Sequence, residues 1–222
     1  MAEVTLYGME FSVYVRIVRL TLAEKGVDYT LEAVDVFEPG LPEYYENLHP
    51  FKQMPAFRHG DVVLYEARAI TQYIDEVFDG PALQPQDPLR RARQSQIISV
   101  ADNHLYRALV WGLFVEIVSK PQEGETTDNA VVTAALKKAK IALPAVARLF
   151  GESPFATGDS IGLADLHLAP MFDYFLRCPA APDLMREQQR LTEWWTAMKQ
   201  RKSVVATPFG RTDDSKLPPL KL

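Results

Sequence analysis

Ser12 is the residue of this sequence that is best placed to act on another chemical group. It stands directly before Val13–Lys25, a run with apolar side chains at helical spacing that ends at Gly26. A serine in front of a helix can cap it by accepting a hydrogen bond from a free backbone N–H group. The same hydroxyl can donate a hydrogen bond to an incoming thiolate, which lowers the thiol pKa. The residues alone leave both interpretations open.

The helix after a first strand is also where dithiol oxidoreductases carry Cys-x-x-Cys, with a thiolate that the helix N-terminus stabilises. Here the corresponding residues are Ser12, Val13, Tyr14 and Val15, so protein dithiol exchange is excluded as the activity. The single cysteine, Cys178, precedes a proline at the end of a predicted helix, and we expect a buried or idle thiol there. One cysteine forms no internal disulfide, which fits a reducing compartment.

The overall composition is that of a packed globular protein without a generally basic surface. The chain has 222 residues, 47% of them hydrophobic, and a formal net charge of -5 at pH 7. The apolar content excludes disorder over the whole chain, and the acidic balance argues against general binding of nucleic acid or anionic membranes. No apolar stretch is long enough to span a bilayer, and the first residues do not resemble a signal peptide. We therefore expect a cytoplasmic protein.

The first part of the chain predicts a small mixed sheet with helices. Besides the helix behind Ser12, the pattern predicts strands at 4–7, 29–36, 56–58 and 62–65, a helical or irregular stretch at 42–48, and a helix at 67–78. The last two strands flank His59-Gly60-Asp61, which indicates a hairpin. A parallel β-α-β unit followed by an antiparallel β-β-α unit is the thioredoxin-like arrangement.

The chain divides at residues 79–89, where three prolines and a glycine cannot continue the preceding helix. Beyond this segment the pattern predicts helices at 89–119, 128–150, 163–176 and 181–201 and no strand. The predicted organisation is therefore a thioredoxin-like domain over residues 1–79, a linker over 80–89 and an all-helical domain over 90–222.

Four motifs in order resemble one known family. Residues 12–26 are similar to the first helix of the glutathione transferase superfamily, and residues 53–57, Gln-Met-Pro-Ala-Phe, look like its cis-proline turn. Residues 66–74 resemble the start of its third helix, and residues 158–167 resemble its buried folding motif. The match covers nearly the whole chain and is closest in kind to serine-class, phi- or theta-like members of bacterial or plant type. It implies an α/β thioredoxin-like domain that binds glutathione, followed by an all-α domain that forms the second-substrate site.

The resemblance implies that a residue at the position of Ser12 activates the thiol of glutathione. It also implies that the peptide bond before Pro55 is cis and that the cysteinyl backbone of glutathione pairs with the free backbone edge of Met54. Lys52 and Gln53 are candidates for holding the glycyl carboxylate. A plain solvated lysine is an equal interpretation of Lys52.

The start of the third predicted helix suits the other end of the tripeptide. The Glu66 carboxylate can receive the α-amine, while the free N–H groups of Ala67 and Arg68 face the α-carboxylate. An acidic residue placed there for the helix dipole has the same geometry. Many relatives carry serine in place of Ala67, and basic residues of some plant-type relatives are replaced here by Pro39 and Gly40. We therefore expect a modest affinity for glutathione.

Other residues near Ser12 have alternative roles. Tyr7 is the rival donor, because tyrosine-type relatives activate the thiol from the first strand, although its spacing to Arg16 matches them less well. Tyr14 also offers a hydroxyl, or it packs as an ordinary helix tyrosine. Arg16 either supports the electrostatics of the thiolate or is a solvated helix residue.

A stripe of apolar side chains marks the first helix of the second part. Its members at helical spacing are Tyr106, Val110, Leu113 and Phe114, with Trp111 one residue off the stripe. Such a stripe is typical of a core. The resemblance implies that one end of this helix walls the electrophile site, with Phe11 opposite, so the candidates for that site are Phe11, Tyr106 and Trp111.

Two residues have predicted structural roles. Asp165 lies three residues after Gly162, a capping-box spacing, and we expect it to be buried and important for folding. Phe51 resembles the aromatic that many relatives insert into a partner subunit, which predicts a homodimer, and packing in the core is the alternative. The histidines show no shared spacing for a metal site, so no metal is expected; they are His49, His59, His104 and His167.

The sequence thus predicts a glutathione transferase that conjugates glutathione to hydrophobic electrophiles with Ser12 as the activating hydroxyl. An isomerase, dehalogenase or peroxidase on the same fold is the first alternative, but relatives with the first two activities tend to carry a cysteine or a serine pair near this helix. A non-catalytic ligand-binding or assembly module, as in a translation elongation factor gamma subunit, is the second. The retained Ser12, Pro55 and Glu66 argue against it.

Overall fold

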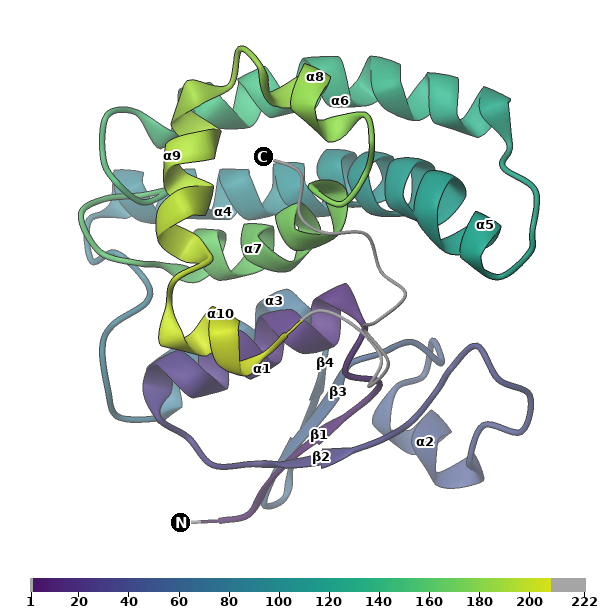
Figure 1. Cartoon of the computed structure of the whole chain (residues 1–222). Coiled ribbons are helices and arrows are strands. Elements are labelled where there is room, and N and C mark those ends of the chain that lie inside the picture. Colours follow the sequence, from purple (N-terminus) through teal and green to yellow (C-terminus); the bar gives the residue numbers. More distant parts are fainter. Residues whose placement is uncertain (1, 209–222) are drawn as a thin grey trace.

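The computed structural model describes residues 2–208 (Figure 1). Its sheet has four strands in the order β2-β1-β3-β4, with β1 parallel to β2 and antiparallel to β3, and β3 antiparallel to β4. The strands are β1 (Val4–Tyr7), β2 (Thr30–Glu32), β3 (Ala56–His59) and β4 (Val62–Tyr65). This topology confirms the predicted β-α-β unit followed by a hairpin.

Three helices accompany the sheet: α1 (Val13–Lys25), α2 (Glu43–Leu48) and α3 (Ala67–Val77). α1 ends where Gly26 adopts a left-handed conformation with φ 66° and donates to the Ala23 carbonyl, as the sequence predicts. Leu6 and Phe57 face each other across β1 and β3 and are fully buried in the core that α1 and α3 share with the helical half. Tyr7, one residue further along β1, packs instead in a smaller cluster with α2. The two faces of the sheet are therefore covered separately.

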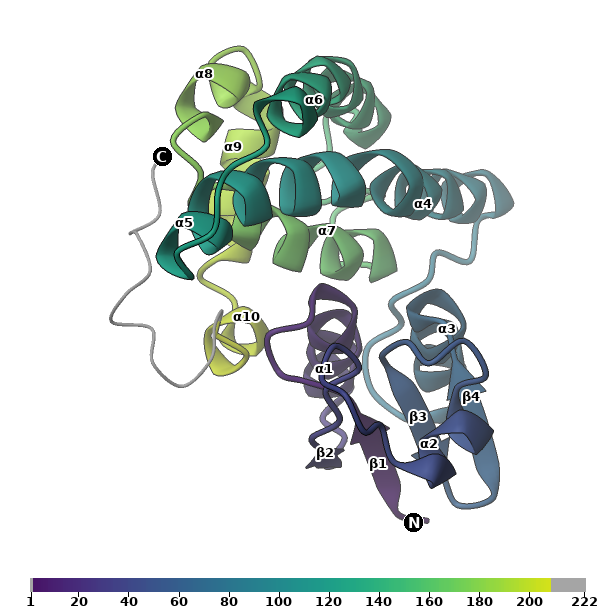
Figure 2. The same cartoon turned by 90° about the vertical axis from the view of Figure 1, so that its right-hand side faces the viewer.

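The second part of the chain contains helices and no strand element within residues 2–208. They are α4 (Pro88–Val100), η1 (Ala101–Ser119), α5 (Lys120–Gln122), α6 (Asn129–Phe150), α7 (Leu163–Phe175), α8 (Ala181–Met185), α9 (Gln189–Met198) and α10 (Lys202–Ala206). α4 and η1 form one continuous helical rod, and η1 is wound as a π-helix. Both views show α7 lying between this rod and α1 (Figures 1 and 2). α7 is therefore the helix through which the second part meets the helix behind Ser12.

The strand predicted over residues 29–36 is much shorter in the structure. β2 pairs with β1 alone, from Thr30 opposite Thr5 to Glu32 opposite Tyr7. Because β1 ends at Tyr7, the chain after Glu32 has no partner strand and leaves the sheet. The alternating pattern continued beyond the point where a neighbour was available.

Two boundaries in the helical part also differ from the prediction. The helix predicted at 181–201 is divided into α8 and α9, with α10 following; a turn closed by the Gln188 N–H and the Met185 carbonyl at 2.8 Å separates the first two. No glycine or proline marks that break, so the periodicity did not reveal it. α4 begins at Pro88, inside the predicted linker, because Asp87 caps it and proline fits a first helical position. Among the described residues no helix is both long and apolar enough to cross a membrane.

Candidate functional site

Ser12 occupies the N-cap position of α1, with φ -67° and ψ 129°. Its Oγ accepts a hydrogen bond from the backbone N–H of Val15 at 3.4 Å, so the predicted capping role is confirmed. This bond uses a lone pair of the hydroxyl and leaves its proton able to donate. Capping and donation to a thiolate are therefore compatible in one residue.

The turn before Ser12 lies against the loop that carries Met54. Gly8 has φ 138°, and a Cβ atom there would come within 2.6 Å of Val15 Cγ2 and 3.0 Å of Met54 Cβ. The N–H of Met9 donates to Met54 Sδ at 3.3 Å, and the peptide bond before Pro55 is cis, as expected. Glycine at position 8 thus permits the close approach that brings the Met54 loop to the start of α1.

Glu66 caps the start of α3 with φ 71°, and its side chain makes no capping hydrogen bond. The residue is exposed, so its carboxylate is accessible to a cation, as the predicted contact with the α-amine requires. Ala67 is buried, and the Arg68 guanidinium turns toward the helical part, where Nη1 donates to Ser99 Oγ at 3.3 Å. Arg68 can therefore contribute to this site through its backbone N–H group, as predicted.

Ser12, residues 52–55 and the start of α3 at Glu66 are called the rim below. Two residues with a strained backbone conformation lie at this rim. Within residues 2–208, the non-glycine residues with positive φ are Lys52, at 52°, and Glu66, at 71°. Such conformations cost on the order of 1–3 kcal/mol and occur preferentially at ligand sites. Both residues belong to the predicted glutathione site. This is a signal that residue types alone do not carry.

The loop around Lys52 is open to solvent. Lys52 Nζ pairs with Glu46 Oε1 at 2.6 Å, and both side chains are more than half exposed. Gln53 is exposed, and its carbonyl accepts a hydrogen bond from the Tyr45 hydroxyl at 2.7 Å. The buried Tyr45 ring therefore anchors the loop, while the Lys52 and Gln53 side chains stay exposed and accessible to a ligand.

Tyr7 and Tyr14, the alternative hydroxyl donors, interact with other parts of the protein. Tyr7 is 5% exposed and packs with the α2 side of the sheet, away from the start of α1. Tyr14 lies in the interface with the helical part, where its hydroxyl donates to Asp102 and its ring lies 4.7 Å from that of Tyr106. Burial and the neighbouring Asp102 raise the pKa of Tyr14. Ser12 remains the hydroxyl at the N-terminus of α1.

Asp102 is a residue of this interface that the sequence analysis missed. Burial raises the pKa of its carboxyl to about 6, against the opposing effects of Arg68 and the Tyr14 hydroxyl. It lies four residues before Tyr106, so it shares a helix face with the predicted electrophile wall. That spacing was the available signal.

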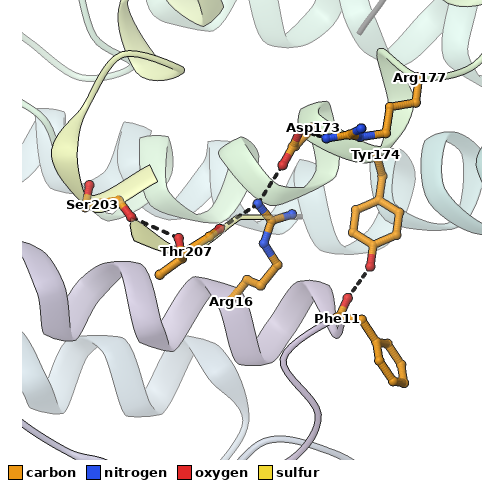
Figure 3. A network of polar contacts seen from close by, with 7 residues as sticks. All are labelled: Phe11, Arg16, Asp173, Tyr174, Arg177, Ser203 and Thr207. Atoms are coloured by element: carbon orange, nitrogen blue, oxygen red, sulfur yellow. Dashed lines mark hydrogen bonds and ion pairs between the residues drawn. The ribbon is translucent and has the colours of Figure 1, made fainter. Parts of the chain in front are cut away.

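The predicted electrophile residues lie on surfaces of different exposure. Tyr106 is half-buried against Tyr14, whereas Trp111 is 41% exposed and its ring meets the exposed Phe37 ring edge-on at 6.2 Å. Phe11 is half-buried, and its ring points away from α7 (Figure 3). The remaining members of the stripe are buried core residues, as such a stripe usually is: Val110, Leu113 and Phe114.

Arg16 is 1% exposed, so its interpretation as a solvated helix residue is wrong. Its Nη2 atom pairs with Asp173 Oδ2 of α7 at 2.6 Å and donates to the Thr207 carbonyl at 3.1 Å (Figure 3). The Tyr174 hydroxyl, also from α7, donates to the Phe11 carbonyl. The start of α1 is thus fastened to the helical part, a contact between distant segments that local sequence patterns do not encode.

The residues with predicted structural roles are largely where expected. Asp165 is fully buried and accepts hydrogen bonds from Ala156 N, Gly162 N and Trp194 Nε1, each at 2.8 Å. Cys178 is buried, which raises the pKa of its thiol to about 12 and makes it a poor nucleophile.

Phe51 is 65% exposed, so the alternative that it packs in the core of its own chain is wrong. Its ring contacts Tyr65 and His49 edge-on, at 6.0 Å and 6.2 Å between centroids.

The four histidines have different surroundings. His59 Nδ1 lies 3.0 Å from the Tyr73 hydroxyl, and His167 Nε2 lies 3.2 Å from Thr71 Oγ1. His49 is buried and His104 is exposed. Among residues 2–208, no group of three or more His, Cys, Asp or Glu side chains has the arrangement of a metal site.

Taken together, the rim offers a hydroxyl donor at a helix N-terminus, a backbone edge beside a cis proline, an exposed carboxylate and free N–H groups at the start of α3. An extended, zwitterionic peptide with a thiol in its middle matches these groups. Of the aromatic side chains of the helical part, Tyr106 contacts Tyr14 of α1 and Trp111 contacts Phe37.

Comparisons with known proteins match both parts of the chain to one family. Residues 6–82 match the model of the glutathione S-transferase N-terminal domain, and residues 106–202 match that of the glutathione S-transferase C-terminal domain. A glutathione S-transferase of Hyoscyamus muticus is 37% identical over 77% of this chain and 82% of its own length. Glutathione S-transferase F14 of Arabidopsis thaliana is 32% identical over 83% of this chain and 74% of its own length.

Solved structures show the same fold. The apo form of glutathione S-transferase III superimposes with a TM-score of 0.82 at 29% identity, covering 98% of this chain and 99% of that structure. Glutathione transferase F2 from Populus trichocarpa gives 0.81 at 27% identity over 92% and 96%. Glutathione S-transferase-I, solved with lactoylglutathione, gives 0.80 at 26% identity over 93% and 98%.

Proposed function

The chain belongs to the glutathione S-transferase family, and we propose that it conjugates glutathione to hydrophobic electrophiles with Ser12 as the thiol-activating hydroxyl. The Ser12 O–H group donates a hydrogen bond to the sulfur and so stabilises the thiolate, while the thiol proton leaves to solvent. The thiolate then forms a C–S bond with the electrophile, and a leaving group departs or a π-bond opens. The observation that carries this assignment is the N-cap geometry of Ser12, which leaves its proton able to donate.

Glutathione is held along the rim of the thioredoxin-like half. Its cysteinyl backbone pairs with Met54 beside the cis bond to Pro55, and its α-carboxylate meets the N–H groups of Ala67 and Arg68. The Glu66 carboxylate receives the α-amine. The positive φ of Glu66 supports this role, because it turns the exposed carboxylate out of the capping position.

The glycyl carboxylate meets Lys52 and Gln53. The ion pair of Lys52 with Glu46 is exposed, so exchanging that partner for a ligand carboxylate costs little. No basic residue stands at Pro39 or Gly40 to assist. The affinity for glutathione is therefore modest.

The electrophile lies between the start of α1 and the aromatic side chains of η1, with Phe11 on one side and Tyr106 and Trp111 on the other. The Tyr106 ring is half-buried and the Trp111 ring is 41% exposed. A hydrophobic electrophile gains contact with both surfaces. This chemistry suits a role in detoxification in the cytoplasm.

Most of the rate enhancement comes from holding the two substrates together. Lowering a thiol pKa from about 8.5 to about 6.5 raises the thiolate fraction at pH 7 roughly 25-fold. The accompanying loss of nucleophilicity, with a Brønsted coefficient of ~0.45, removes about 8-fold of this gain. The remaining factor of about 3 leaves proximity in a desolvated cleft as the larger contribution.

The division into a glutathione-binding domain over residues 1–79, a linker over 80–89 and a helical domain over 90–222 follows the same functional split, with α4 starting inside the linker. We assign the exposed Phe51, with its edge-on contacts to Tyr65 and His49, to the interface of a homodimer. Neither a metal nor a nucleic acid takes part in this scheme.

The decisive experiment follows the ultraviolet absorbance of bound glutathione thiolate against pH. The intact protein is compared with Ser12→Ala and with Tyr14→Phe, which removes the neighbouring hydroxyl but leaves Ser12 in place. We expect a depressed thiol pKa in the intact protein and in Tyr14→Phe, and a return toward the free value in Ser12→Ala.

Other outcomes point to the alternative functions. Binding with an unshifted thiol pKa would exclude activation by Ser12 and favour a ligand-binding role. A shifted pKa with no conjugation of chlorodinitrobenzene would direct effort to isomerase, dehalogenase or peroxidase substrates. Absence of glutathione binding would favour an assembly module.

A further inference from the structure

Two neighbouring residues of α7, Asp173 and Tyr174, bind the chain on both sides of Ser12. The Tyr174 hydroxyl donates to the carbonyl of Phe11, the residue before Ser12. Asp173 Oδ2 accepts from Arg16 Nη2 at 2.6 Å, one helical turn after Ser12. Figure 3 shows both side chains reaching from α7 to the start of α1. The helical half therefore contacts the segment that carries the activating hydroxyl.

These contacts fix the backbone around Ser12. The peptide group before it is held at both polar atoms, because its carbonyl accepts from Tyr174 and its N–H donates to the Met9 carbonyl at 3.0 Å. The carbonyl of Ser12 accepts from the N–H of Arg16 at 2.9 Å. Since both peptide planes that flank its Cα atom are held, the direction of the Cα–Cβ bond of Ser12 is set.

These contacts are buried. Tyr174 is 8% exposed, and its ring meets the Phe114 ring edge-on at 4.7 Å. Asp173 is 6% exposed and also pairs with Arg177 at 3.3 Å, while Arg16 donates to the Thr207 carbonyl at 3.1 Å. Water competes little for hydrogen bonds in such surroundings, so they hold their geometry firmly.

We propose that Tyr174, assisted by Asp173, is a positioning residue for thiol activation and holds the Ser12 hydroxyl where it meets the thiolate of glutathione. This inference rests on the proposed function, because Tyr174 acts through Ser12. Catalytic geometry is sensitive to supporting contacts, and a displacement of about 1 Å can cost about 100-fold in rate. Activation of glutathione by the first half is thus set by a residue of the second half.

The test measures the thiol pKa of bound glutathione in Tyr174→Phe, which keeps the ring against Phe114 and removes only the hydroxyl. We expect the pKa to rise by about half a pH unit, which lowers the thiolate fraction about threefold below the pKa. The dissociation constant of glutathione should stay within about twofold, because Tyr174 is buried and is not among the residues proposed to hold glutathione. The matched control is Tyr73→Phe, which removes a half-buried hydroxyl that pairs with His59 far from Ser12, and it should leave the thiol pKa unchanged.

A double-mutant cycle separates positioning from a general structural effect. In a Ser12→Ala background, Tyr174→Phe should add no further rise in the thiol pKa. An equal rise in both backgrounds would overturn the inference. So would an unchanged pKa in Tyr174→Phe while Ser12→Ala raises it, and in that case the role of Ser12 would stand. If Ser12→Ala itself has no effect, the proposed mechanism and this inference fail together.

Asp173→Asn provides a second route if Tyr174→Phe does not fold. It removes a negative charge near the site, so a purely electrostatic influence would lower the thiol pKa. A loosened Arg16 would release the start of α1 and raise it. A rise supports the positioning role, whereas a fall or no change overturns it.

Discussion

Two ion pairs that involve residues of the thioredoxin-like half have the same length but opposite solvent exposure. Arg16 and Asp173 approach to 2.6 Å with side chains 1% and 9% exposed, at the interface with the helical half. Lys52 and Glu46 also approach to 2.6 Å, but with side chains 56% and 55% exposed, at the glutathione rim. Buried charges depend on their partner because they have lost water, whereas exposed charges exchange partners at little cost. Burial, and not distance, therefore separates the fixed interface from the adaptable rim.

The largest effect is expected from breaking the buried pair. Arg16→Met keeps much of the side-chain length but leaves Asp173 without its closest partner, and it should lower the free energy of unfolding by about 4 kcal/mol. The comparison variant Lys52→Met should change it by less than about 0.5 kcal/mol. Urea unfolding of both variants, followed by fluorescence and circular dichroism, measures the difference. Equal losses would contradict the distinction between interface and rim.

Asp165 extends the comparison to buried polar contacts within one half. Asp165→Ala leaves the N–H groups of Ala156, Gly162 and Trp194 without their acceptor and should cost about 3 kcal/mol of stability. Asp159 is an exposed carboxylate in the same motif, and Asp159→Ala should cost less than about 0.5 kcal/mol. Thermal unfolding at one pH checks both. A stable Asp165→Ala variant would remove the structural role assigned to this residue.

His167, buried at the interface, should make a contribution to stability that is lost in acid. Burial, assisted by the charge of Arg68, lowers the pKa of His167 to about 3. Because this lies below the unfolded value of about 6.5, the unfolded chain binds more protons as the pH falls, and stability present above about pH 6.5 is lost below it. Between about pH 6.5 and pH 5 the loss from this group is about 2 kcal/mol.

The measurement compares unfolding free energies at pH 7 and pH 5. His167→Gln should raise the stability at pH 5 relative to that at pH 7 by about 2 kcal/mol compared with the intact protein, even if it lowers stability at both pH values. The exposed His104 provides the control, and His104→Gln should retain the full difference. An unchanged pH dependence in His167→Gln would show that other groups cause the acid sensitivity.

The smallest effect is expected at the rim itself. Lys52→Met should weaken glutathione binding about threefold, or about 0.7 kcal/mol, by removing one contact with the glycyl carboxylate. Lys140→Met, at an exposed position of α6, should leave the affinity unchanged. Isothermal titration of both variants with glutathione decides the point. The weakening should shrink at high salt, because the contact is solvent-exposed.

The order of secondary structure and both ends of α1 were predictable from sequence. Each rests on local chemistry: strand alternation, helical periodicity, Ser12 before a helix, and Gly26 at its end. The resemblance to the family implied the cis bond before Pro55, and the capping-box spacing after Gly162, together with that resemblance, predicted the burial of Asp165. The structure confirms the Ser12 cap, the end of α1 at Gly26, the cis bond and the buried Asp165. The residues expected to hold glutathione and the domain bounds stay predictions.

Tertiary structure alone decided which polar side chains are buried against a partner and which stay exposed to solvent. The partners of Arg16 and Tyr174 lie 157 and 163 positions away in the sequence, and Asp102 lies 102 − 14 = 88 positions from its partner Tyr14. The end of β2 depended on the length of its neighbour, and the break between α8 and α9 carried no glycine or proline. Local patterns record which face a side chain takes, but burial and pairing arise only when distant segments pack against one another.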